Sequence, residues 1–214
     1  MNNKSFSQQD EATLASILAA RRDVRGNNFT AKAVTDESLE KILQAASLAP
    51  SVGYSQPWEF VLVRDQAIKT QIAASFDEEN LRAENTFSEQ KKPLYSSMKL
   101  EGIVEAPVNI AVFYRPSKGP VLGQNTMLEM GEYSVVCAVQ NMWLMSRTMN
   151  IGMGWVSILN PETVKNILNA PPENKLIAYL CVGYVETFLD RPELEINQWQ
   201  SKKPLADAVY HDSY

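Results

Sequence analysis

The 214-residue sequence contains a single histidine, His211, which lies near the C-terminus among polar neighbours. Catalytic sites that pair histidine with serine or cysteine, and metal centres rich in histidine, would depend on that one position. The two cysteines, Cys137 and Cys181, stand in apolar surroundings without CxxC spacing. This arrangement favours buried free thiols in a reducing compartment over a disulfide or a zinc site. Histidine-based catalysis and a metal centre are therefore disfavoured.

Long apolar runs and phosphate-binding glycine motifs are also missing. No run approaches the roughly 20 residues of a membrane span, and the N-terminus lacks the apolar core of a signal peptide. Neither a P-loop nor a GxGxxG motif follows a strand-like stretch. The net charge of -5 argues against a general nucleic-acid binder. We therefore expect one cytoplasmic globular domain, residues 1–214, with neither a membrane nor a nucleic acid as its partner.

A dense charge cluster, Arg21-Arg22-Asp23-Val24-Arg25, follows the first amphipathic stretch. Arginine side chains match phosphate oxygens in bidentate geometry and remain charged at any working pH. An isolated cluster of this kind is more often a solvated helix end. The absence of histidine, metal and dinucleotide motifs shifts the balance toward an anion site with an embedded carboxylate, that of Asp23.

The hydrophobic pattern predicts helices and strands that alternate along the chain. Helix starts are indicated by capping residues before apolar stripes, namely Asp10, Thr35, Asp65 and Asn160. Continuous apolar runs predict buried strands at residues 60–63, 108–114, 154–159 and 176–185. The longest helical pattern, residues 127–150, is apolar over more than half of its circumference. We expect that helix in the core, or also against a second subunit.

Three further segments are polar and lack a clear apolar face. The loop at residues 51–58 carries hydroxyl and amide groups that can reach the polar edge of a planar ligand, although a capped turn has the same composition. Residues 76–98 fit a mobile lid over a site and a solvated surface helix equally well. The tail, from about residue 186 to 214, has too little apolar content to fold alone, so we expect an extended arm along a partner.

Several long motifs, in this order, resemble the nitroreductase-like flavoproteins. They are RRDVRGNNF, APSVGYSQPWEFVLV, GEYSVVCAVQNMWLMSRTMNIGMGWVSIL and AYLCVGYVETFLDRPELE. The resemblance runs from Leu14 to about Trp199, and within the family it is strongest to the oxygen-dependent dimethylbenzimidazole synthases. It implies an α+β fold with a central mixed β-sheet flanked by helices. It also implies a C-terminal arm exchanged in a homodimer.

This resemblance implies that reduced FMN is a substrate that the enzyme consumes. In that branch, reduced FMN and molecular oxygen yield 5,6-dimethylbenzimidazole, the lower ligand of cobalamin, together with D-erythrose 4-phosphate. The reduced flavin comes from a separate reductase, so NAD(P)H contributes only indirectly. Two alternatives remain open: an FMN-dependent NAD(P)H nitroreductase or flavin reductase that retains its flavin, and a flavin-binding module without turnover.

The resemblance also assigns roles to individual residues. It implies that Asp23 is catalytic and shuttles protons, and that Ser157 is a second catalytic residue whose hydroxyl hydrogen-bonds to the flavin or to bound oxygen. No metal is expected, and the expected FMN contacts are Arg21, Arg22, Asp23, Val24, Arg25, Ser51, Ser55, Gln56, Pro57, Ser157, Ile158 and Arg191. We expect the neighbouring arginines to lower the pKa of Asp23. Iodotyrosine deiodinases, the nearest alternative branch, have a lid glutamate four residues before a tyrosine, whereas Lys91 precedes Tyr95 here.

Overall fold

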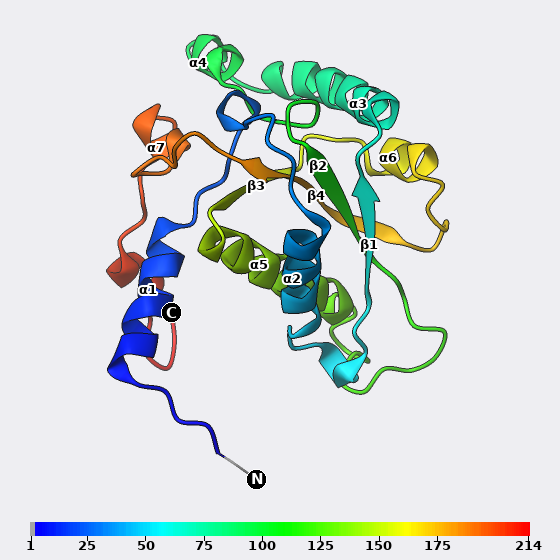
Figure 1. The fold of residues 1–214 in the computed structure, drawn as a ribbon, viewed down its shortest axis with the longest axis vertical. Coiled ribbons are helices and arrows are strands. Elements are labelled where there is room, and N and C mark those ends of the chain that lie inside the picture. The colour runs from blue at the N-terminus through cyan, green and yellow to red at the C-terminus, as the bar shows by residue number, and fades with distance from the viewer. Residues whose placement is uncertain (1–2) are drawn as a thin grey trace.

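A computed structural model describes residues 3–214 as a four-stranded sheet with helices on both faces (Figure 1). The strands are β1 (Trp58–Val63), β2 (Val108–Tyr114), β3 (Ile151–Val156) and β4 (Lys175–Tyr184). They lie in the order β1-β2-β4-β3. The apolar runs predicted all four strands, but β1 begins two residues before the expected residue 60, and β3 begins three residues before the expected residue 154.

All three strand pairings are antiparallel, whereas a mixed sheet was expected. The parallel component is limited to an isolated bridge between Asp23 and Met153, which lies outside the named strands. The segment that follows the first helix therefore lies beside β3 at one edge of the sheet. This places the arginine cluster next to a strand end, where loops and side chains can form a site.

Helices cover the sheet and fill the connections between strands. Their bounds are α1 (Gln8–Ala20), α2 (Asp36–Ser47), α3 (Gln66–Glu84), α4 (Lys92–Ser97), α5 (Met130–Thr148), α6 (Pro161–Ile167) and α7 (Glu193–Ile196). The expected caps Thr35, Asp65 and Asn160 each accept a hydrogen bond from a backbone N–H in the first turn. Asp10 instead lies in the first turn of α1, because Ser7 is the cap and the two residues form a reciprocal capping box.

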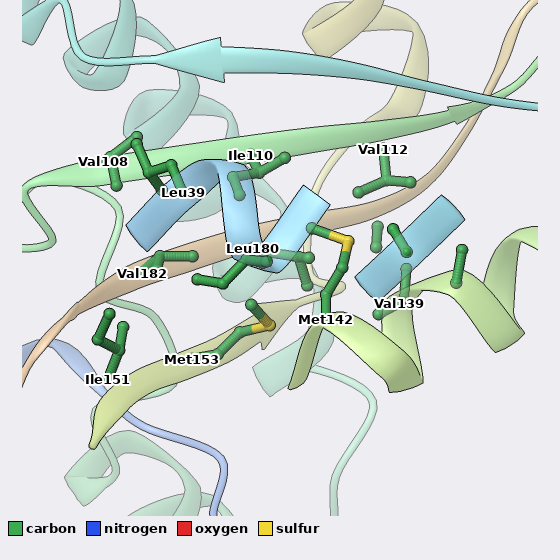
Figure 2. Packing of buried hydrophobic residues seen from close by; sticks show 14 of the residues in the cluster. Leu39, Val108, Ile110, Val112, Val139, Met142, Ile151, Met153, Leu180 and Val182 are labelled. Carbon is green, nitrogen blue, oxygen red and sulfur yellow. The ribbon is translucent and has the colours of Figure 1, made fainter. Parts of the chain in front are cut away.

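The main core lies between the sheet and the pair α2 and α5. Figure 2 shows Leu39 of α2 and Met142 of α5 among side chains from β2, β3 and β4. A second cluster fills the opposite face beneath α3 and α6 and includes Ile72 and Val164. Strand β2 contributes to both clusters, since successive side chains point to opposite faces. Its nearly continuous burial confirms the prediction of a strand covered on both sides.

Helix α3 contains the first part of residues 76–98, for which a mobile lid and a solvated surface helix were both left open. The helix continues from the buried side chains of Ile72 and Phe76 to Glu84, so the first part of this segment is a solvated surface helix. The remainder is a turn followed by the short helix α4, and Tyr95 on α4 is buried. Among the helices of residues 3–214, none has the length and apolarity needed to cross a membrane.

Apolar side chains on α1 and α5 remain at the surface. Leu14 and Leu18 of α1 are about half exposed, and no residue of α1 is fully buried. On α5, Tyr133, Val136 and Cys137 are exposed although the opposite face of the helix is part of the core. The prediction of two buried thiols was therefore wrong for Cys137, because the sequence around it is apolar on a face that this chain leaves uncovered. Cys181 is buried, as predicted.

Candidate active site

The arginine cluster is fixed against β3 by backbone contacts. The N–H of Val24 donates to the carbonyl of Met153 at 3.2 Å, next to the parallel bridge that Asp23 makes with the same residue. Gly154 permits this approach, because a Cβ at that position would lie 2.1 Å from the carbonyl oxygen of Val24. The glycine-rich sequence of β3 thus lets the backbone of the arginine cluster lie directly against the strand. This contact positions the side chains of the cluster.

The carboxylate of Asp23 has two partners. Its Oδ1 accepts a hydrogen bond of 2.9 Å from the N–H of Trp155, and its Oδ2 forms an ion pair with Arg25. Burial raises the pKa of Asp23 above its ordinary value of 3.8, while Arg25, the Trp155 N–H and Arg21 act in the opposite direction. The expectation of a lowered pKa was wrong, because the loss of hydration outweighs the nearby positive charges. A raised pKa suits a carboxyl group that both accepts and donates protons.

The three arginines of the cluster have different surroundings. Arg25 donates from Nη1 to the carbonyl of Leu100 at 3.0 Å, and the guanidinium of Arg21 lies 4.7 Å from the ring centroid of Trp143. The guanidinium of Arg22 is committed to four backbone carbonyls, those of Ala19, Arg21, Leu189 and Asp190. Arg21 and Arg25 are therefore the cations best placed to face an anion, while Arg22 ties the end of α1 to the C-terminal segment.

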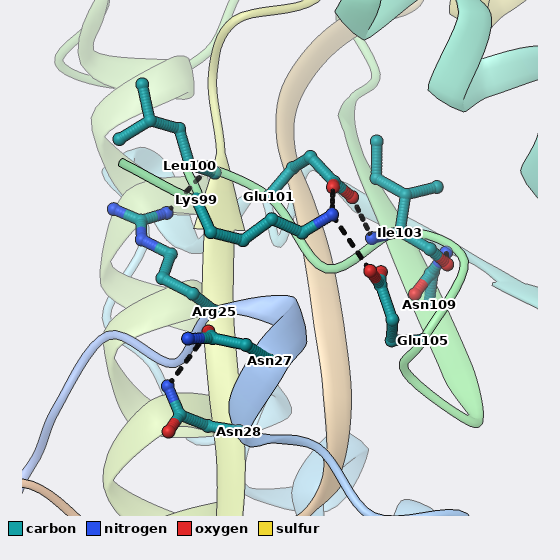
Figure 3. Close-up of polar contacts among 9 residues, drawn as sticks. All are labelled: Arg25, Asn27, Asn28, Lys99, Leu100, Glu101, Ile103, Glu105 and Asn109. Atoms are coloured by element: carbon teal, nitrogen blue, oxygen red, sulfur yellow. Dashed lines mark hydrogen bonds and ion pairs between the residues drawn. The ribbon is translucent and has the colours of Figure 1, made fainter. Parts of the chain in front are cut away.

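A loop behind the cluster supports Arg25, as Figure 3 shows. Lys99 pairs with the carboxylates of Glu101 and Glu105, and Glu101 also accepts a hydrogen bond of 2.6 Å from the N–H of Ile103. The carbonyl of Glu101 accepts from the N–H of Gly26 at 2.8 Å. The loop that follows α4 is thereby joined to the backbone on the far side of Arg25.

A cavity of about 120 Å³ opens in front of the cluster. It is lined by Arg21, Arg22, Asp23, Arg25, Pro192, Glu193 and Leu194. Glu193 begins α7, and sequence reasoning did not identify it. Burial raises the pKa of Glu193, Arg25 opposes this shift, and Asp23 adds to it. Three arginines and two acidic residues therefore line one small space.

A second cavity of about 250 Å³ adjoins the first. Its lining is Arg25, Phe87, Tyr95, Met98, Leu100, Trp155, Ser157, Ile158, Leu194 and Trp199. Arg25 and Leu194 line both cavities, so the site has a charged end and a mainly apolar, aromatic end. Ser157 follows β3 directly, and Ser157 and Ile158, both expected flavin contacts, line this second cavity.

Trp199 closes the aromatic end of the site. Its ring packs edge-on against Phe87, with 5.1 Å between centroids, and lies 6.2 Å from the ring of Tyr95. The ammonium of Lys91 lies 4.9 Å from the same ring. The side chains expected to form a lid are thus held by the C-terminal segment of the same chain. Residues 201–214, in contrast, are exposed throughout.

The loop predicted to face the flavin lies elsewhere in this chain. Ser51 Oγ accepts from the N–H of Gln56 at 3.1 Å, and the carbonyl of Pro57 accepts from the N–H of Arg115 at 2.8 Å. Ser55 Oγ is buried and has no hydrogen-bond partner within residues 3–214. Gln56 has a positive φ of 46°, an uncommon conformation for a residue with a side chain. An unsatisfied hydroxyl and a strained backbone are both typical of binding loops.

The strand register gives the separation between this loop and the arginine cluster. The loop enters β1 at Trp58, which is opposite Tyr114 at one end of β2. Asp23 bridges Met153, whose partner on β4 is Val182, and that residue is opposite Val108 at the other end of β2. Six residues of β2 correspond to roughly 20 Å. One chain therefore does not bring the two predicted parts of the flavin site together.

The remaining predicted contact, Arg191, lies outside the charged cavity. It is exposed and precedes Pro192, the first lining residue of that segment. Sequence reasoning noted the Asp190-Arg191-Pro192 segment but chose its arginine, whereas the structure directs Glu193 and Leu194 at the cluster.

Comparison with known proteins places the chain in a family. The model of the nitroreductase family matches residues 18–184. The chain belongs to the nitroreductase family. Among its relatives in that family, a 5,6-dimethylbenzimidazole synthase from Rhodospirillum rubrum is 42% identical over 193 residues. The match covers 89% of this chain and 90% of that protein.

Solved structures of nitroreductase-like proteins share the fold. An iodotyrosine deiodinase bound to FMN and 3-iodo-L-tyrosine has a TM-score of 0.73 and 23% identity, covering 94% of this chain and 100% of that one. A BluB-like flavoprotein from Clostridium difficile 630 has a TM-score of 0.70 and 22% identity, covering 98% and 100% of the two chains. At these identities the likeness establishes the nitroreductase architecture of the sheet and its helices.

Proposed function

We propose that this member of the nitroreductase family is a 5,6-dimethylbenzimidazole synthase. It fragments reduced FMN in the presence of molecular oxygen, yielding 5,6-dimethylbenzimidazole, the lower ligand of cobalamin, and D-erythrose 4-phosphate. The observation that carries the proposal is the continuous site in which Arg25 joins a cationic cavity to an aromatic cavity, with the carboxylate of Asp23 beside it. The relative at 42% identity supports the choice of this reaction within the family.

The residues of the site fit FMN. The guanidinium groups of Arg21 and Arg25 match the phosphate, a dianion at neutral pH with oxygens that accept bidentate hydrogen bonds. The cavity beside Trp155 and Ser157 offers flat aromatic walls and a hydroxyl to a planar ring system. When bound, reduced flavin supplies the electrons and the carbon skeleton of the product. The protein supplies binding, orientation and the movement of protons.

Asp23 is the residue that we assign to proton transfer. The Trp155 N–H fixes Oδ1, so the carboxylate has one orientation and its Oδ2 is directed at Arg25. A carboxylate held in this way is positioned before the substrate arrives, which lowers the reorganisation needed during the reaction. The raised pKa of Asp23 narrows the free-energy gap between its two protonation states. Ser157, which has a hydroxyl that can both donate and accept, is assigned to hydrogen bonding at the ring end of the site.

A homodimer completes the site in our proposal. Ser55 and Gln56 lie roughly 20 Å along β2 from the arginine cluster of their own chain, so they serve the site of a second copy. The buried hydroxyl of Ser55 without a partner supports this assignment. The exposed apolar side chains of α1 and α5, including Leu14 and Val136, provide a surface that a second copy can cover. The exposed tail, residues 201–214, provides the arm that lies along that copy.

The proposed reaction is tested by following the fate of the flavin. Protein is mixed anaerobically with chemically reduced FMN, air is admitted, and the products are identified by absorbance and mass spectrometry. We expect 5,6-dimethylbenzimidazole and D-erythrose 4-phosphate in equal amounts, with reduced flavin in the cell delivered by a separate reductase that uses NAD(P)H. Full recovery of oxidised FMN would refute the proposal. Rapid NAD(P)H oxidation by the protein alone would instead identify a nitroreductase or flavin reductase, and binding without either reaction would identify a flavin-binding module.

The phosphate assignment is tested separately with Arg25→Ala. Because this side chain contributes charge-assisted hydrogen bonds worth about 1.5–3 kcal/mol each, FMN binding should weaken by roughly 10- to 100-fold. Riboflavin, which lacks the phosphate, should lose much less affinity. Titration of flavin fluorescence measures both dissociation constants. An equal loss for the two ligands would show that Arg25 does not bind the phosphate.

A further inference from the structure

Glu193 is one of two acidic residues that line the cavity beside the arginine cluster. It lines the 120 Å³ space together with Arg21, Arg22, Asp23 and Arg25. Within residues 3–214 its side chain forms no hydrogen bond or ion pair, whereas both oxygens of Asp23 have partners. Glu193 is therefore the acidic group of this site whose charge is not already compensated by direct contact.

The backbone segment that carries Glu193 is anchored on both sides. Arg22 donates to the carbonyls of Leu189 and Asp190, which lie four and three residues before Glu193. On the other side, Trp199 packs against Phe87 and Tyr95. A ligand that enters the cavity consequently meets the backbone of Glu193 in place, because moving this backbone would break contacts at both ends of the segment.

The charges of the cavity conflict when a phosphate enters. Arg21, Arg22 and Arg25 carry three positive charges, Asp23 and Glu193 carry up to two negative charges, and a phosphate monoester adds nearly two more at neutral pH. Arg22 already uses its donors on backbone carbonyls and adds little direct binding. An ionised Glu193 beside the phosphate would be repelled, and a like charge held nearby favours the neutral acid.

We propose that Glu193 takes up a proton from solvent when a phosphate monoester enters this cavity, and then donates a hydrogen bond to a phosphate oxygen. The inference rests on the proposed function, since the ligand is the phosphate end of FMN. Its chemistry is the conversion of one carboxylate to a carboxylic acid, with no other bond made or broken. The site thereby holds a proton next to Asp23 before the reaction begins.

The surroundings of Glu193 support a change of charge at this position. Burial already raises its pKa without ligand, Arg25 opposes that effect, and Asp23 adds to it. The charged groups that face it from the arginine segment are the four that line the cavity, and on its own segment Arg191 is exposed and Glu195 lies outside the cavity lining. A phosphate dianion would add a further negative charge at close range, and its effect on Glu193 has the same sign as that of Asp23.

The test measures protons taken up on binding of oxidised FMN. Calorimetric titrations near pH 7, in buffers with different ionisation enthalpies, give the number of protons bound per FMN for the wild type and Glu193→Gln. The phosphate, whose second pKa is about 6, and Glu193 titrate as a coupled pair, so the difference between the two proteins counts the protons taken up by that pair. The phosphorus-31 chemical shift of bound FMN reports the protonation of the phosphate, and the remaining uptake belongs to Glu193. We expect uptake of up to about one proton more in the wild type than in the variant. Glu193→Gln, which mimics the neutral acid, should bind FMN at least as tightly as the wild type does. The affinity of the wild type should rise toward lower pH, and this rise should be smaller in the variant.

Two controls keep the outcomes separate. Glu195→Gln, on the same short helix, should retain wild-type proton uptake and affinity, and Glu193→Ala should lose the uptake as Glu193→Gln does. Equal proton uptake in the wild type and both Glu193 variants would overturn the inference, as would a large loss of FMN affinity in Glu193→Gln. Riboflavin should cause no uptake. If riboflavin and FMN bound the wild type equally, the phosphate site of the proposed function would fail, and the inference would fail with it.

Discussion

Replacing Gly154 by alanine should separate the arginine segment from β3. A Cβ at this position would lie 2.1 Å from the carbonyl oxygen of Val24, whereas an ordinary contact needs about 3.4 Å. The obstructing atom belongs to the backbone, so a side-chain rotation cannot relieve the clash. The two segments must move apart by about 1.3 Å, the difference between these two distances.

A shift of that size would break two hydrogen bonds. The bond from the Val24 N–H to Met153 is 3.2 Å long and would exceed the normal limit, and the bond from Trp155 to Asp23 depends on the same separation. A neutral bond contributes about 1 kcal/mol and a bond to a charged group about 2 kcal/mol, so the loss is about 3 kcal/mol. For a chain of this length, the melting temperature should fall by roughly 6–12 °C.

Thermal unfolding and flavin titration together check this prediction. Gly119→Ala is the matched control, because a Cβ at that position has no heavy atom within 4 Å, and its stability should stay within about 0.5 kcal/mol of the wild type. Gly154→Ala should also bind FMN more weakly, since Asp23 and Arg25 move with their backbone. A melting temperature and an FMN affinity equal to those of Gly119→Ala would refute the reasoning that this close packing positions the site.

Two further substitutions test the catalytic and lid assignments. Asp23→Asn should retain FMN binding and yield no 5,6-dimethylbenzimidazole in the air-admission assay, and normal product formation would remove Asp23 from proton transfer. Burial raises the pKa of Asp23, so ionisation of this carboxyl group lowers the stability of the folded wild type. The unfolding free energy of Asp23→Asn minus that of the wild type should therefore increase as the pH rises from 3.8 through the raised pKa. Chemical denaturation at several pH values measures this difference, and a difference that does not change with pH would contradict the prediction. Trp199→Ala removes aromatic and cation–π contacts worth about 2 kcal/mol, so opening of residues 85–98 should become roughly 30-fold more favourable. Limited proteolysis between residues 85 and 98 should accelerate accordingly, whereas Tyr210→Ala, in the exposed tail, should leave the cleavage rate unchanged.

The elements that the sequence predicted well are those whose signal is local. Strand β2 is apolar at nearly every position because both of its faces are covered, and the caps Thr35 and Asn160 act on N–H groups three residues away. Helix α3 was only half recognised, since beyond Phe76 it packs little and has no apolar stripe. Its continuation to Glu84 depends on helix-forming residues rather than on a buried face.

The parts of the site that sequence reasoning missed depend on contacts between distant segments. The pKa of Asp23 was assigned the wrong direction because its neighbours in sequence are charged, while its burial comes from β3, about 130 residues later. Glu193 has no motif of its own, and only the anchoring of its segment by Arg22 reveals where its carboxylate lies. Ser55 was predicted to contact flavin, and its unsatisfied hydroxyl keeps that prediction in place for a second copy of the chain.

The contact between Arg22 and Leu189 spans 167 residues. During synthesis, the arginine cluster leaves the ribosome long before the segment that forms the outer wall of both cavities. A growing chain can therefore fold the helix and loop that carry the cluster, but it cannot enclose a ligand until residues 189–199 have been added. Closing so long a loop is also slow compared with forming a helix. The capacity to capture a reactive reduced flavin should thus appear late in the folding of each molecule, after the rest of the core has formed.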